Sequence, residues 1–309
     1  MRKNKNANFA GKRVAIIGLG LLGTSLGLAL KNSGYWRSGW SRKVSSRKEA
    51  LNMQAVDEIF ESPAGALKEA DISVICLPIP QIISFCIENA EAFKKSSVVT
   101  DVGSVKECIV KKVSPVLAER NVQFVGSHPM AGSEKSGANA ARFDLYCGAT
   151  VFITPAEGNT EEALRKIKRL WEKVGAQTFC LTAKQHDALV ACTSHLPHLT
   201  ASALVQTILD SDSKLAKMRK LGCAGGFRDC TRTASSNPQM WREIFENNKN
   251  AVLKALGSFQ ETLQEFTAII KNDSFDILEK KLDKAKSVRD AWLEEYESRA
   301  KNIPSHLKK

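Results

Sequence analysis

The order of predicted elements divides this chain into an α/β half with a mostly parallel sheet and an all-helical half. Short β-branched runs alternate with helix-like segments, such as residues 160–174, up to Leu181. This alternation is typical of a parallel sheet covered by helices on both faces. After Leu181 only helical spacing follows, so we predict domains at residues 1–182 and 183–309. The predicted strands are residues 14–17, 72–77, 98–100, 122–125, 150–154 and 177–181.

The charge of the chain is unusual, although its other bulk properties are ordinary. Its 309 residues suffice for two cores, and 43% hydrophobic and 25% charged residues are typical of globular proteins. The net charge is +12, with much of the surplus in residues 1–13 and 271–309. No aromatic residues are interleaved there in a nucleic-acid-binding pattern. We therefore expect a solvated basic surface and no nucleic-acid partner.

Cysteine usage and the N-terminus both favour a cytoplasmic protein. The eight cysteines include no CxxC pair and several lie in apolar runs, as expected of reduced, buried thiols. Glycines interrupt the apolar stretch that begins at Val14, so it does not resemble a cleaved signal peptide. No apolar run approaches the roughly 18 residues that a membrane span requires. We expect no membrane association.

The helical half contains a long apolar stripe. Residues 183–209 predict a helix interrupted near Pro197, and Pro238 suits the first turn of another helix capped by Asn237. We predict that this second helix continues to Asn272–Asp273 and that another covers residues 275–299. A stripe this long packs against partner helices, in the same chain or in a homodimer. Its members are Trp241, Phe245, Asn248, Val252, Leu256, Phe259, Leu263, Phe266 and Ile270.

A glycine-rich turn after the first predicted strand indicates a dinucleotide site. In GLGLLG, Gly18 permits the tight turn, Gly20 lets the backbone approach a pyrophosphate, and Gly23 lets helix and strand pack closely. The N-terminus of the following helix supplies N–H donors and positive potential. We also assign to this site Leu21, Leu22, Leu77 and Pro78.

The end of the second strand bears on cofactor choice. An acid about 20 residues after the glycine turn favours NAD, and here that place holds Ser41, Arg42 and Lys43. Ser41 can hydrogen-bond a 2′-phosphate, while the two cations can neutralise it. We therefore favour NADP over NAD. The alternative is that both cations are merely solvated and NAD binds without its usual acid.

Residues 126–137, GSHPMAGSEKSG, contain the candidate acid/base. His128 directly follows an apolar strand-like run, small residues leave room for a ligand, and an imidazole exchanges protons near neutral pH. Together with the glycine turn, this predicts a hydride transfer coupled to proton transfer. The alternative is a hydrogen-bonded structural histidine.

Other polar residues are candidates for the same site. Ser104 follows another strand and could orient His128 or the substrate, or cap a helix; Lys106 is a rival catalytic residue by spacing alone. In SHLPH, His198 suits polar contact with a substrate and His195 a structural role. No metal-binding spacing accompanies them, so we expect no metal.

Two arginines follow a glycine pair in GGFRDCTR. Arg228 and Arg232 can bind a carboxylate in bidentate fashion, although either could instead pair with Asp229 or another acid.

Six blocks occur in the order found in one enzyme family. They are GLGLLGTSLGLAL, TDVGSVK, GSHPMAGSEKSG, SHLPH, GGFRDCTR and NPQMWREIFENN. Over residues 12–300 the chain resembles the prephenate/arogenate dehydrogenase family. The resemblance implies a Rossmann-type NAD(P)-binding domain followed by a helical domain that forms homodimers. It also implies a decarboxylating dehydrogenase of tyrosine biosynthesis.

The resemblance further implies residue roles. His128 takes the proton of the ring hydroxyl with Ser104 as its partner, and Arg232 holds the ring carboxylate. Arg228 stands where relatives can carry lysine. The side-chain pocket falls on Ser133, Glu134, His198, Gly225, Arg228 and Trp241.

Several functions remain open on the sequence. We favour prephenate dehydrogenase, because His198 suits a keto group. Glu134 could pair with an ammonium and favours arogenate. A β-hydroxyacid dehydrogenase would depend on a catalytic lysine, and a non-catalytic dinucleotide sensor would be expected to lose His128 or Arg232, both of which are present.

Overall fold

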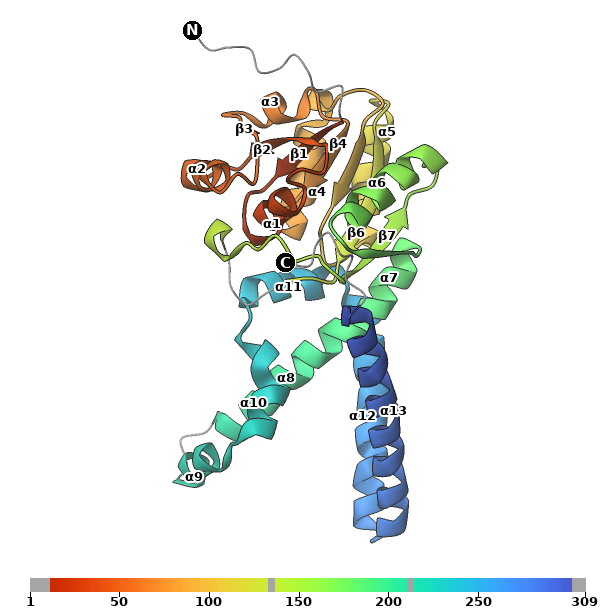
Figure 1. Cartoon of the computed structure of the whole chain (residues 1–309). Helices are drawn as coiled ribbons and strands as arrows, with labels where there is room; N and C mark the ends of the chain where they lie inside the picture. Colours follow the sequence, from red (N-terminus) through yellow and green to blue (C-terminus); the bar gives the residue numbers. More distant parts are fainter. Residues whose placement is uncertain (1–11, 133–136, 211–213, 302–309) are drawn as a thin grey trace. The chain divides into compact units, whose positions relative to one another are not determined.

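The first half of the chain forms an eight-stranded sheet with the order β3-β2-β1-β4-β5-β6-β7-β8 (Figure 1). The computed structural model describes residues 12–132, 137–210 and 214–301. All neighbouring strands pair in parallel except β6 and β7, which are antiparallel. The strands are β1 (Arg13–Ile17), β2 (Trp36–Trp40), β3 (Glu58–Ile59), β4 (Ile72–Ile75), β5 (Val98–Asp101), β6 (Gln123–Pro129), β7 (Thr150–Pro155) and β8 (Gln177–Cys180).

The six predicted strands all form, and one of them is longer than predicted in a way that changes the position of His128. The strand predicted at residues 122–125 extends to Pro129, because β7 continues to pair with it and places His128 opposite Phe152. His128 therefore lies within a strand rather than after one. Strand β2 was predicted only through its end, near residues 39–43, and it ends at Trp40. The two-residue strand β3 was not predicted, since two residues cannot show an alternating pattern.

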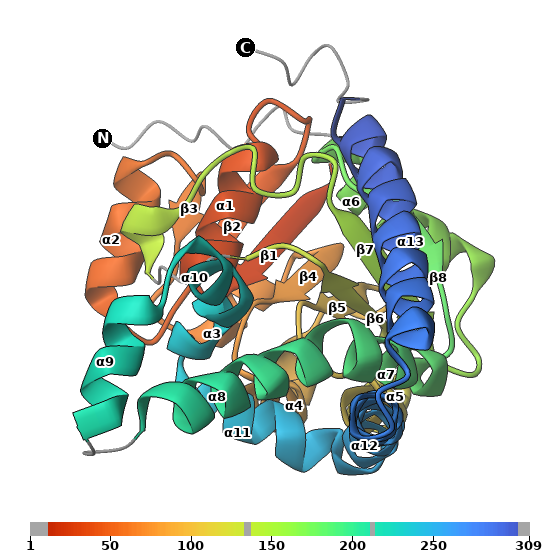
Figure 2. The ribbon, with the colours of Figure 1, turned by 90° about the horizontal axis from the view of Figure 1, so that it is seen from below.

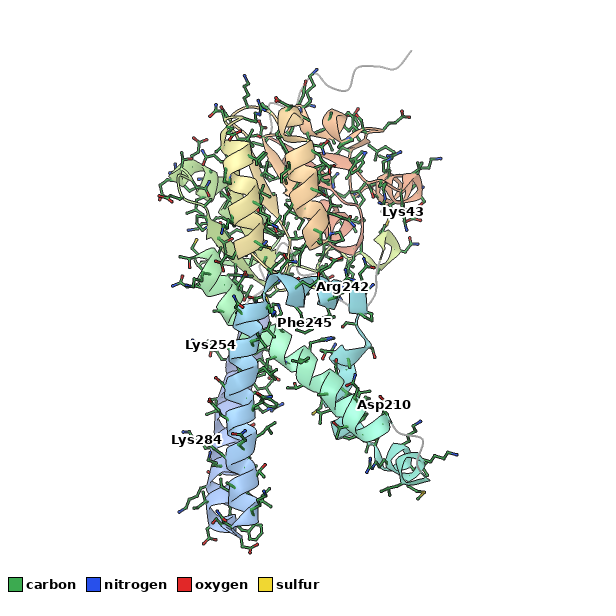
Figure 3. All side chains as sticks on the ribbon, turned by 180° about the vertical axis from the view of Figure 1, so that it is seen from behind. Lys43, Asp210, Arg242, Phe245, Lys254 and Lys284 are labelled. Atoms are coloured by element: carbon green, nitrogen blue, oxygen red, sulfur yellow. The ribbon has the colours of Figure 1, made fainter. Side chains whose placement is uncertain are left out.

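Helices cover both faces of the sheet, as the strand–helix alternation predicts. Alternate side chains of β1 point to opposite faces: Val14 and Ile16 to one apolar core, Ala15 and Ile17 to the other. Figure 3 shows α4 and α5 side by side over the second face. The helices here are α1 (Leu21–Ala29), α2 (Val44–Asn52), α3 (Pro63–Leu67), α4 (Ile79–Glu88), α5 (Glu107–Ala118), α6 (Glu161–Lys173) and α11 (Pro238–Asn247).

The chain forms two compact units. The first comprises residues 1–187 and 237–247, and the second comprises residues 188–236 and 248–309. Helix α7 (Ala183–Val190) carries the chain from one unit to the other, and Figure 2 shows it leading into α8. The second unit contains α8 (Leu196–Leu209), α9 (Lys214–Gly222), α10 (Gly225–Thr231), the 3-10 turn η5 (Arg232–Ser235), α12 (Lys249–Lys271) and α13 (Phe275–Lys301).

The prediction of one long helix from Pro238 to the break at Asn272–Asp273 is wrong. The helix predicted to begin at Pro238 ends at Asn247, and α12 begins at Lys249. Between them Asn248 is buried, and its side-chain amide lies 3.2 Å from the Nδ1 atom of His195. The apolar stripe is therefore split. Trp241 and Ile244 of α11 pack on the sheet unit, and the residues from Val252 onward belong to the helical unit.

The start of α11 and the interruption of the preceding long helix follow the sequence more closely. The Asn237 Oδ1 atom accepts hydrogen bonds from the backbone N–H groups of Gln239 and Met240, which is the predicted cap. The helix from Ala183 to Leu209 is interrupted by a π-helical turn, Ala191–His195, just before Pro197. Such turns occur frequently at functional sites.

The stretch Ala183–Leu209 is long and apolar enough to cross a membrane, contrary to the sequence-based expectation. It has 27 residues and a mean hydropathy of 1.2 in its most apolar window. However, core helices pass the same test, and this stretch carries His186, Asp187, His195 and His198, all buried. Polar groups of this kind need hydrogen-bonding partners, which lipid does not supply. Composition alone therefore does not make this helix a membrane span.

Candidate functional site

The glycine turn has the geometry that a dinucleotide requires. Gly18 has a φ of +98°, and a Cβ atom there would lie 2.3 Å from the carbonyl oxygen of Cys76. A Cβ atom on Gly23 would lie 2.0 Å from the carbonyl oxygen of Gly18, whereas one on Gly20 would meet nothing within 4 Å. Two glycines therefore allow close packing, and the third opens onto free space where a pyrophosphate can approach.

The start of α1 completes this turn. Gly20 is its N-cap and makes no side-chain capping bond, so the first-turn N–H groups of Leu21 and Leu22 can serve an anion. Leu77 follows β4 and packs beside Gly18, and Pro78 caps α4. The residues present fit a dinucleotide phosphate at this turn.

Two cations follow the end of β2. Arg42 and Lys43 are exposed, Ser41 is half-buried, and Lys43 precedes α2 (labelled in Figure 3). Arg47 donates a hydrogen bond from Nη1 to the carbonyl oxygen of Ser41 at 3.0 Å. Arg47 therefore holds the loop, while Arg42 and Lys43 face solvent.

A buried ion pair organises the carboxyl edge of the sheet. Asp101, at the end of β5, forms a buried ion pair with Lys106; both side chains are fully buried. The Asp101 carboxylate also accepts hydrogen bonds from the backbone N–H groups of Gly103 and Ser127. Lys106 therefore has a structural partner in the described part of the chain, which weakens its case as a catalytic residue.

His128 belongs to a directed chain of three side chains. Its Nδ1 atom lies 2.9 Å from Nε2 of His186, and the Nδ1 atom of His186 lies 2.7 Å from Oδ1 of Asp187. The two imidazole rings meet edge to face at 68°, and Phe152 packs against His186 from β7. Burial is the largest influence on His186 and lowers its pKa, while the hydrogen bond to Asp187 raises it.

His186 and Asp187 were not predicted as site residues. They lie 58 and 59 residues after His128, on a helix that spacing alone assigns to the other half of the chain. The available signal was a histidine directly followed by an acid in a largely apolar helix. Ser104, the predicted partner of His128, lies half-buried in the loop before α5.

The helical unit brings three predicted substrate residues into neighbouring segments. His198 is buried on α8, which packs against η5 and α10. Burial lowers its pKa, and a hydrogen bond with the backbone of Thr233 raises it. Arg232 is exposed and begins η5, and Gly225 is the first residue of α10.

The two arginines of this unit differ in their partners. Arg228 pairs with Asp229 at 3.0 Å through exposed side chains. Among the described residues, Arg232 has no carboxylate within 4.0 Å. The sequence left open which arginine would form a salt bridge, and Arg228 is that one.

The remaining predicted residues fall elsewhere. Trp241 is half-buried on α11, in the sheet unit, with its ring 5.6 Å from that of Phe245. Ser133 and Glu134 lie outside the residues that the structure describes. The described residues contain no group of three side chains suited to a metal ion.

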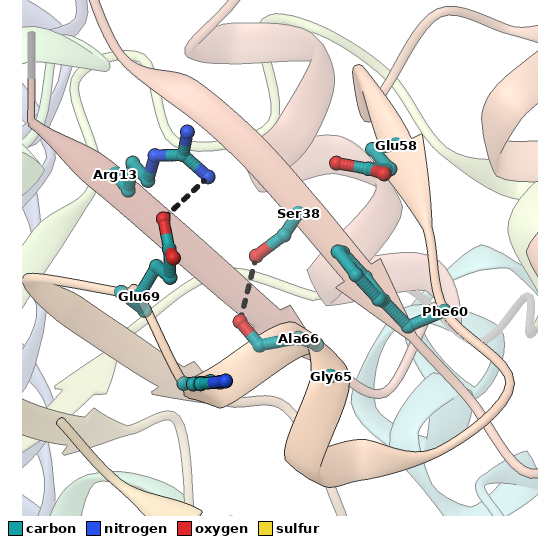
Figure 4. Close-up of a pocket in the computed structure, with 9 residues that line it drawn as sticks. Arg13, Ser38, Glu58, Phe60, Gly65, Ala66 and Glu69 are labelled. Carbon is teal, nitrogen blue, oxygen red and sulfur yellow. Dashed lines mark hydrogen bonds and ion pairs between the residues drawn. The ribbon is translucent and has the colours of Figure 1, made fainter. Parts of the chain in front are cut away.

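A pocket at the amino edge of the sheet does not belong to this site. It lies between α3 and the strands β1, β2 and β3, and Figure 4 shows its two internal bonds. Ser38 donates to the carbonyl oxygen of Ala66, and Arg13 pairs with Glu69. Ligands of open α/β sheets bind at the carboxyl edge, so this pocket is not the candidate site.

The sheet, the glycine turn and the histidine at the carboxyl edge define an NAD(P)-dependent dehydrogenase. The chain belongs to the prephenate dehydrogenase family: residues 26–180 match its nucleotide-binding domain and residues 182–284 match its dimerization domain.

Three relatives illustrate the similarity. The prephenate dehydrogenase of Bacillus subtilis (strain 168) is 32% identical over 280 residues, which are 90% of this chain and 75% of the relative. The crystal structure of prephenate dehydrogenase from A. aeolicus, in complex with hydroxyphenyl propionate and NAD+, has a TM-score of 0.84 at 32% identity, covering 91% of this chain and 98% of that one. Synechocystis arogenate dehydrogenase has a TM-score of 0.81 at 30% identity, covering 91% and 99%.

The glycine turn generates a paired prediction. Gly20→Ala adds a methyl group to open space, so we expect unchanged thermal stability but NAD(P) binding weakened by at least tenfold. Gly23→Ala forces contact with the carbonyl oxygen of Gly18, so we expect lower stability as well. Thermal unfolding and cofactor titration by fluorescence measure both effects. Wild-type cofactor affinity in Gly20→Ala would show that the pyrophosphate does not approach this turn.

Proposed function

We propose that this chain oxidises and decarboxylates prephenate to 4-hydroxyphenylpyruvate, with hydride transfer to NAD(P)+, as a step of tyrosine biosynthesis. The observation that carries the proposal is the placement of His128. It lies at the carboxyl end of β6, in the same parallel set of strands as the glycine turn after β1. Family membership supports the same reaction.

The reaction needs a base, a hydride acceptor and groups that bind the substrate. His128 takes the proton of the ring hydroxyl, and the O–H electron pair forms the carbonyl as the adjacent carbon gives up hydride. NAD(P)+ held at the glycine turn would supply the hydride acceptor. The bond to the ring carboxylate then breaks and carbon dioxide leaves. Its electron pair completes the aromatic ring, and the carbonyl oxygen becomes a phenolate that regains its proton from His128.

We assign the substrate-binding roles from the resemblance. Arg232 binds the ring carboxylate, because a guanidinium suits a planar anion and Arg232 is not engaged as Arg228 is. His198, Gly225 and Trp241 contribute to the side-chain pocket, as do Ser133 and Glu134, and Ser104 assists His128. His198 offers an N–H group to the keto oxygen of prephenate.

Arogenate, which carries an amine in place of the keto group, is the second candidate substrate. Glu134 favours it, because a carboxylate pairs with an ammonium. The same chemistry at the ring applies to both substrates.

Steady-state kinetics test the proposal. We expect activity with prephenate and a lower kcat/KM with arogenate. We expect His128→Asn to lower kcat by about 10²–10⁴-fold, the usual contribution of a positioned base. Cofactor affinity should stay unchanged in that variant.

The control is Lys184→Gln, a substitution of an exposed residue on α7, which should retain wild-type rates. Near-normal turnover in His128→Asn would contradict the role of His128. Higher kcat/KM with arogenate would make that compound the substrate.

We propose further that NADP is the preferred cofactor. The end of β2 carries Ser41, Arg42 and Lys43 in place of the acid that binds ribose hydroxyls. The N-terminus of α2, directly after Lys43, has no acidic residue in its first turn. Both features favour a 2′-phosphate electrostatically.

Arg42→Ala tests the cofactor preference. One charge-assisted contact of about 1.5–3 kcal/mol corresponds to roughly a 10–150-fold preference, and exposure reduces it. We expect KM for NADP to rise several-fold while KM for NAD stays within about twofold. Lys48→Ala, an exposed cation on α2, is the matched control. A wild-type enzyme with kcat/KM for NAD at or above that for NADP would contradict the preference.

We propose that the α12–α13 pair forms part of the homodimer interface. The two helices pack together and leave large apolar side chains exposed, which a second copy would cover. Figure 3 labels Lys254 on α12 and Lys284 on α13. The large exposed apolar residues of the two helices are Leu253, Leu263, Ile270, Phe275, Ile277, Leu282, Val288, Trp292 and Tyr296.

A charge on this face should separate the subunits. Leu263 is 49% exposed within a single chain, so Leu263→Glu should not disturb its own fold. We expect a dimer-to-monomer shift at micromolar concentration by light scattering after size exclusion. Gln264→Glu, an exposed neighbour on α12, should remain dimeric. A dimeric Leu263→Glu variant would place the interface elsewhere.

A cytoplasmic location is also proposed. All eight cysteines are free thiols, as suits a reducing compartment, and burial raises the pKa of Cys108 to about 11. The expectation of buried thiols is met by Cys86 but is wrong for Cys180, Cys192 and Cys230, which are exposed.

A further inference from the structure

We propose that His186 and Asp187 are positioning residues that fix the tautomer and orientation of His128, so that its Nε2 atom is the one that accepts the substrate proton. This inference rests on the proposed function for its catalytic meaning. The hydrogen-bond direction itself follows from atoms within the sheet unit. Neither residue contacts the reacting atoms in this scheme; both act through His128.

The direction of the hydrogen bonds that link His128, His186 and Asp187 is set at Asp187. Its Oδ1 atom accepts from the backbone N–H of Lys106 at 2.7 Å, and its Oδ2 atom accepts from that of Glu107 at 2.9 Å. Backbone N–H groups only donate, and they lie at the positive N-terminus of α5. The side chain therefore acts as a carboxylate acceptor, and His186 donates to it from Nδ1.

The bond from His186 to Asp187 also determines the direction of the hydrogen bond between His186 and His128. Burial lowers the pKa of His186, which favours the neutral ring. A neutral imidazole with its proton on Nδ1 has an acceptor at Nε2. That atom faces Nδ1 of His128 at 2.9 Å, so His128 donates from Nδ1 and carries its lone pair on Nε2.

The proton balance in the reaction is complete with these groups. The substrate O–H bond breaks and an N–H bond forms at Nε2 of His128, which becomes an imidazolium with protons on both nitrogens. The Nδ1–H bond to His186 is kept throughout, and the nearby Asp187 carboxylate offsets the new charge. Decarboxylation leaves a phenolate oxygen on the ring, and this oxygen takes the proton back from Nε2 of His128, which restores the base.

Among the described residues, three charged groups act on His186. Asp187 lies on its own helix, and Asp101 and Lys106 come from the end of β5 and the loop before α5. Lys106 acts against protonation of His186, while the two carboxylates favour it. The side facing β7 is apolar, because Phe152 covers it.

Nitrogen-15 NMR of the full-length protein, labelled on histidine, tests the direction of these hydrogen bonds without substrate. The tautomer of each neutral ring follows from its long-range nitrogen–proton couplings, with assignment by the His128→Asn and His186→Gln variants. We expect the Nδ1–H tautomer for both His128 and His186. The Nε2–H tautomer for neutral His128 would overturn the proposal.

Kinetics of paired variants test the positioning role. His186→Leu removes the acceptor, and we expect kcat to fall about 10–100-fold with KM within about threefold, a smaller loss than for His128 itself. His186→Gln places an amide oxygen near the former Nε2 position and should recover most of that loss. Equal losses in both variants, with KM rising, would show a merely structural role.

The pH profile separates the two roles further. Without an acceptor for Nδ1, the His128 imidazolium is less stable, so the acid limb of kcat/KM should move to lower pH by about one to two units in His186→Leu. An unmoved limb would contradict the inference. If His128→Asn keeps wild-type turnover, the proposed function fails while the NMR result still decides the tautomer. Should His186→Leu not fold, His186→Gln and the wild-type NMR decide the matter.

Discussion

The buried pair of Asp101 and Lys106 holds the carboxyl edge of the sheet together. A buried charge without its partner costs about 3–5 kcal/mol, so neither residue can be lost alone. The carboxylate also binds the backbone of Ser127, the residue before His128, and the lysine backbone binds Asp187. One ion pair thus connects β5, β6 and the start of α5 to α7.

This connection explains how a strand residue can be a positioned base. Ser127 is fixed by hydrogen bonds to the carbonyl oxygen of Asp101 and to Trp171, and β7 pairs with β6 on its other side. The main chain at His128 therefore has little freedom. Only rotation of its ring and the position of its proton remain, and His186 restrains both.

The sequence was sufficient for the fold and for the residues whose chemistry is local. The glycine turn and the alternation of strands and helices follow from patterns within about 30 residues, and the structure has both. His186 was missed because its partner is 58 residues away, a distance over which periodicity carries no information. The stripe from Trp241 was treated as one helix because spacing continues across Asn248, although the buried amide of that residue bonds to His195 and ends the helix.

The chain passes between its two units three times, at residues 187/188, 236/237 and 247/248. At each passage an acidic or amide side chain makes a specific bond: Asp187 to the start of α5, Asn237 to the start of α11, and Asn248 to His195. Apolar residues at these places would leave helix N–H groups or a buried imidazole without those bonds, at a cost of about 1–3 kcal/mol each. Asp187, at the first passage, also carries the negative charge that sets the hydrogen-bond direction at His128. The Asp187 carboxylate therefore lies at the boundary of the sheet unit and accepts hydrogen bonds from N–H groups at the start of α5. It also determines which nitrogen of the His128 ring can accept a proton.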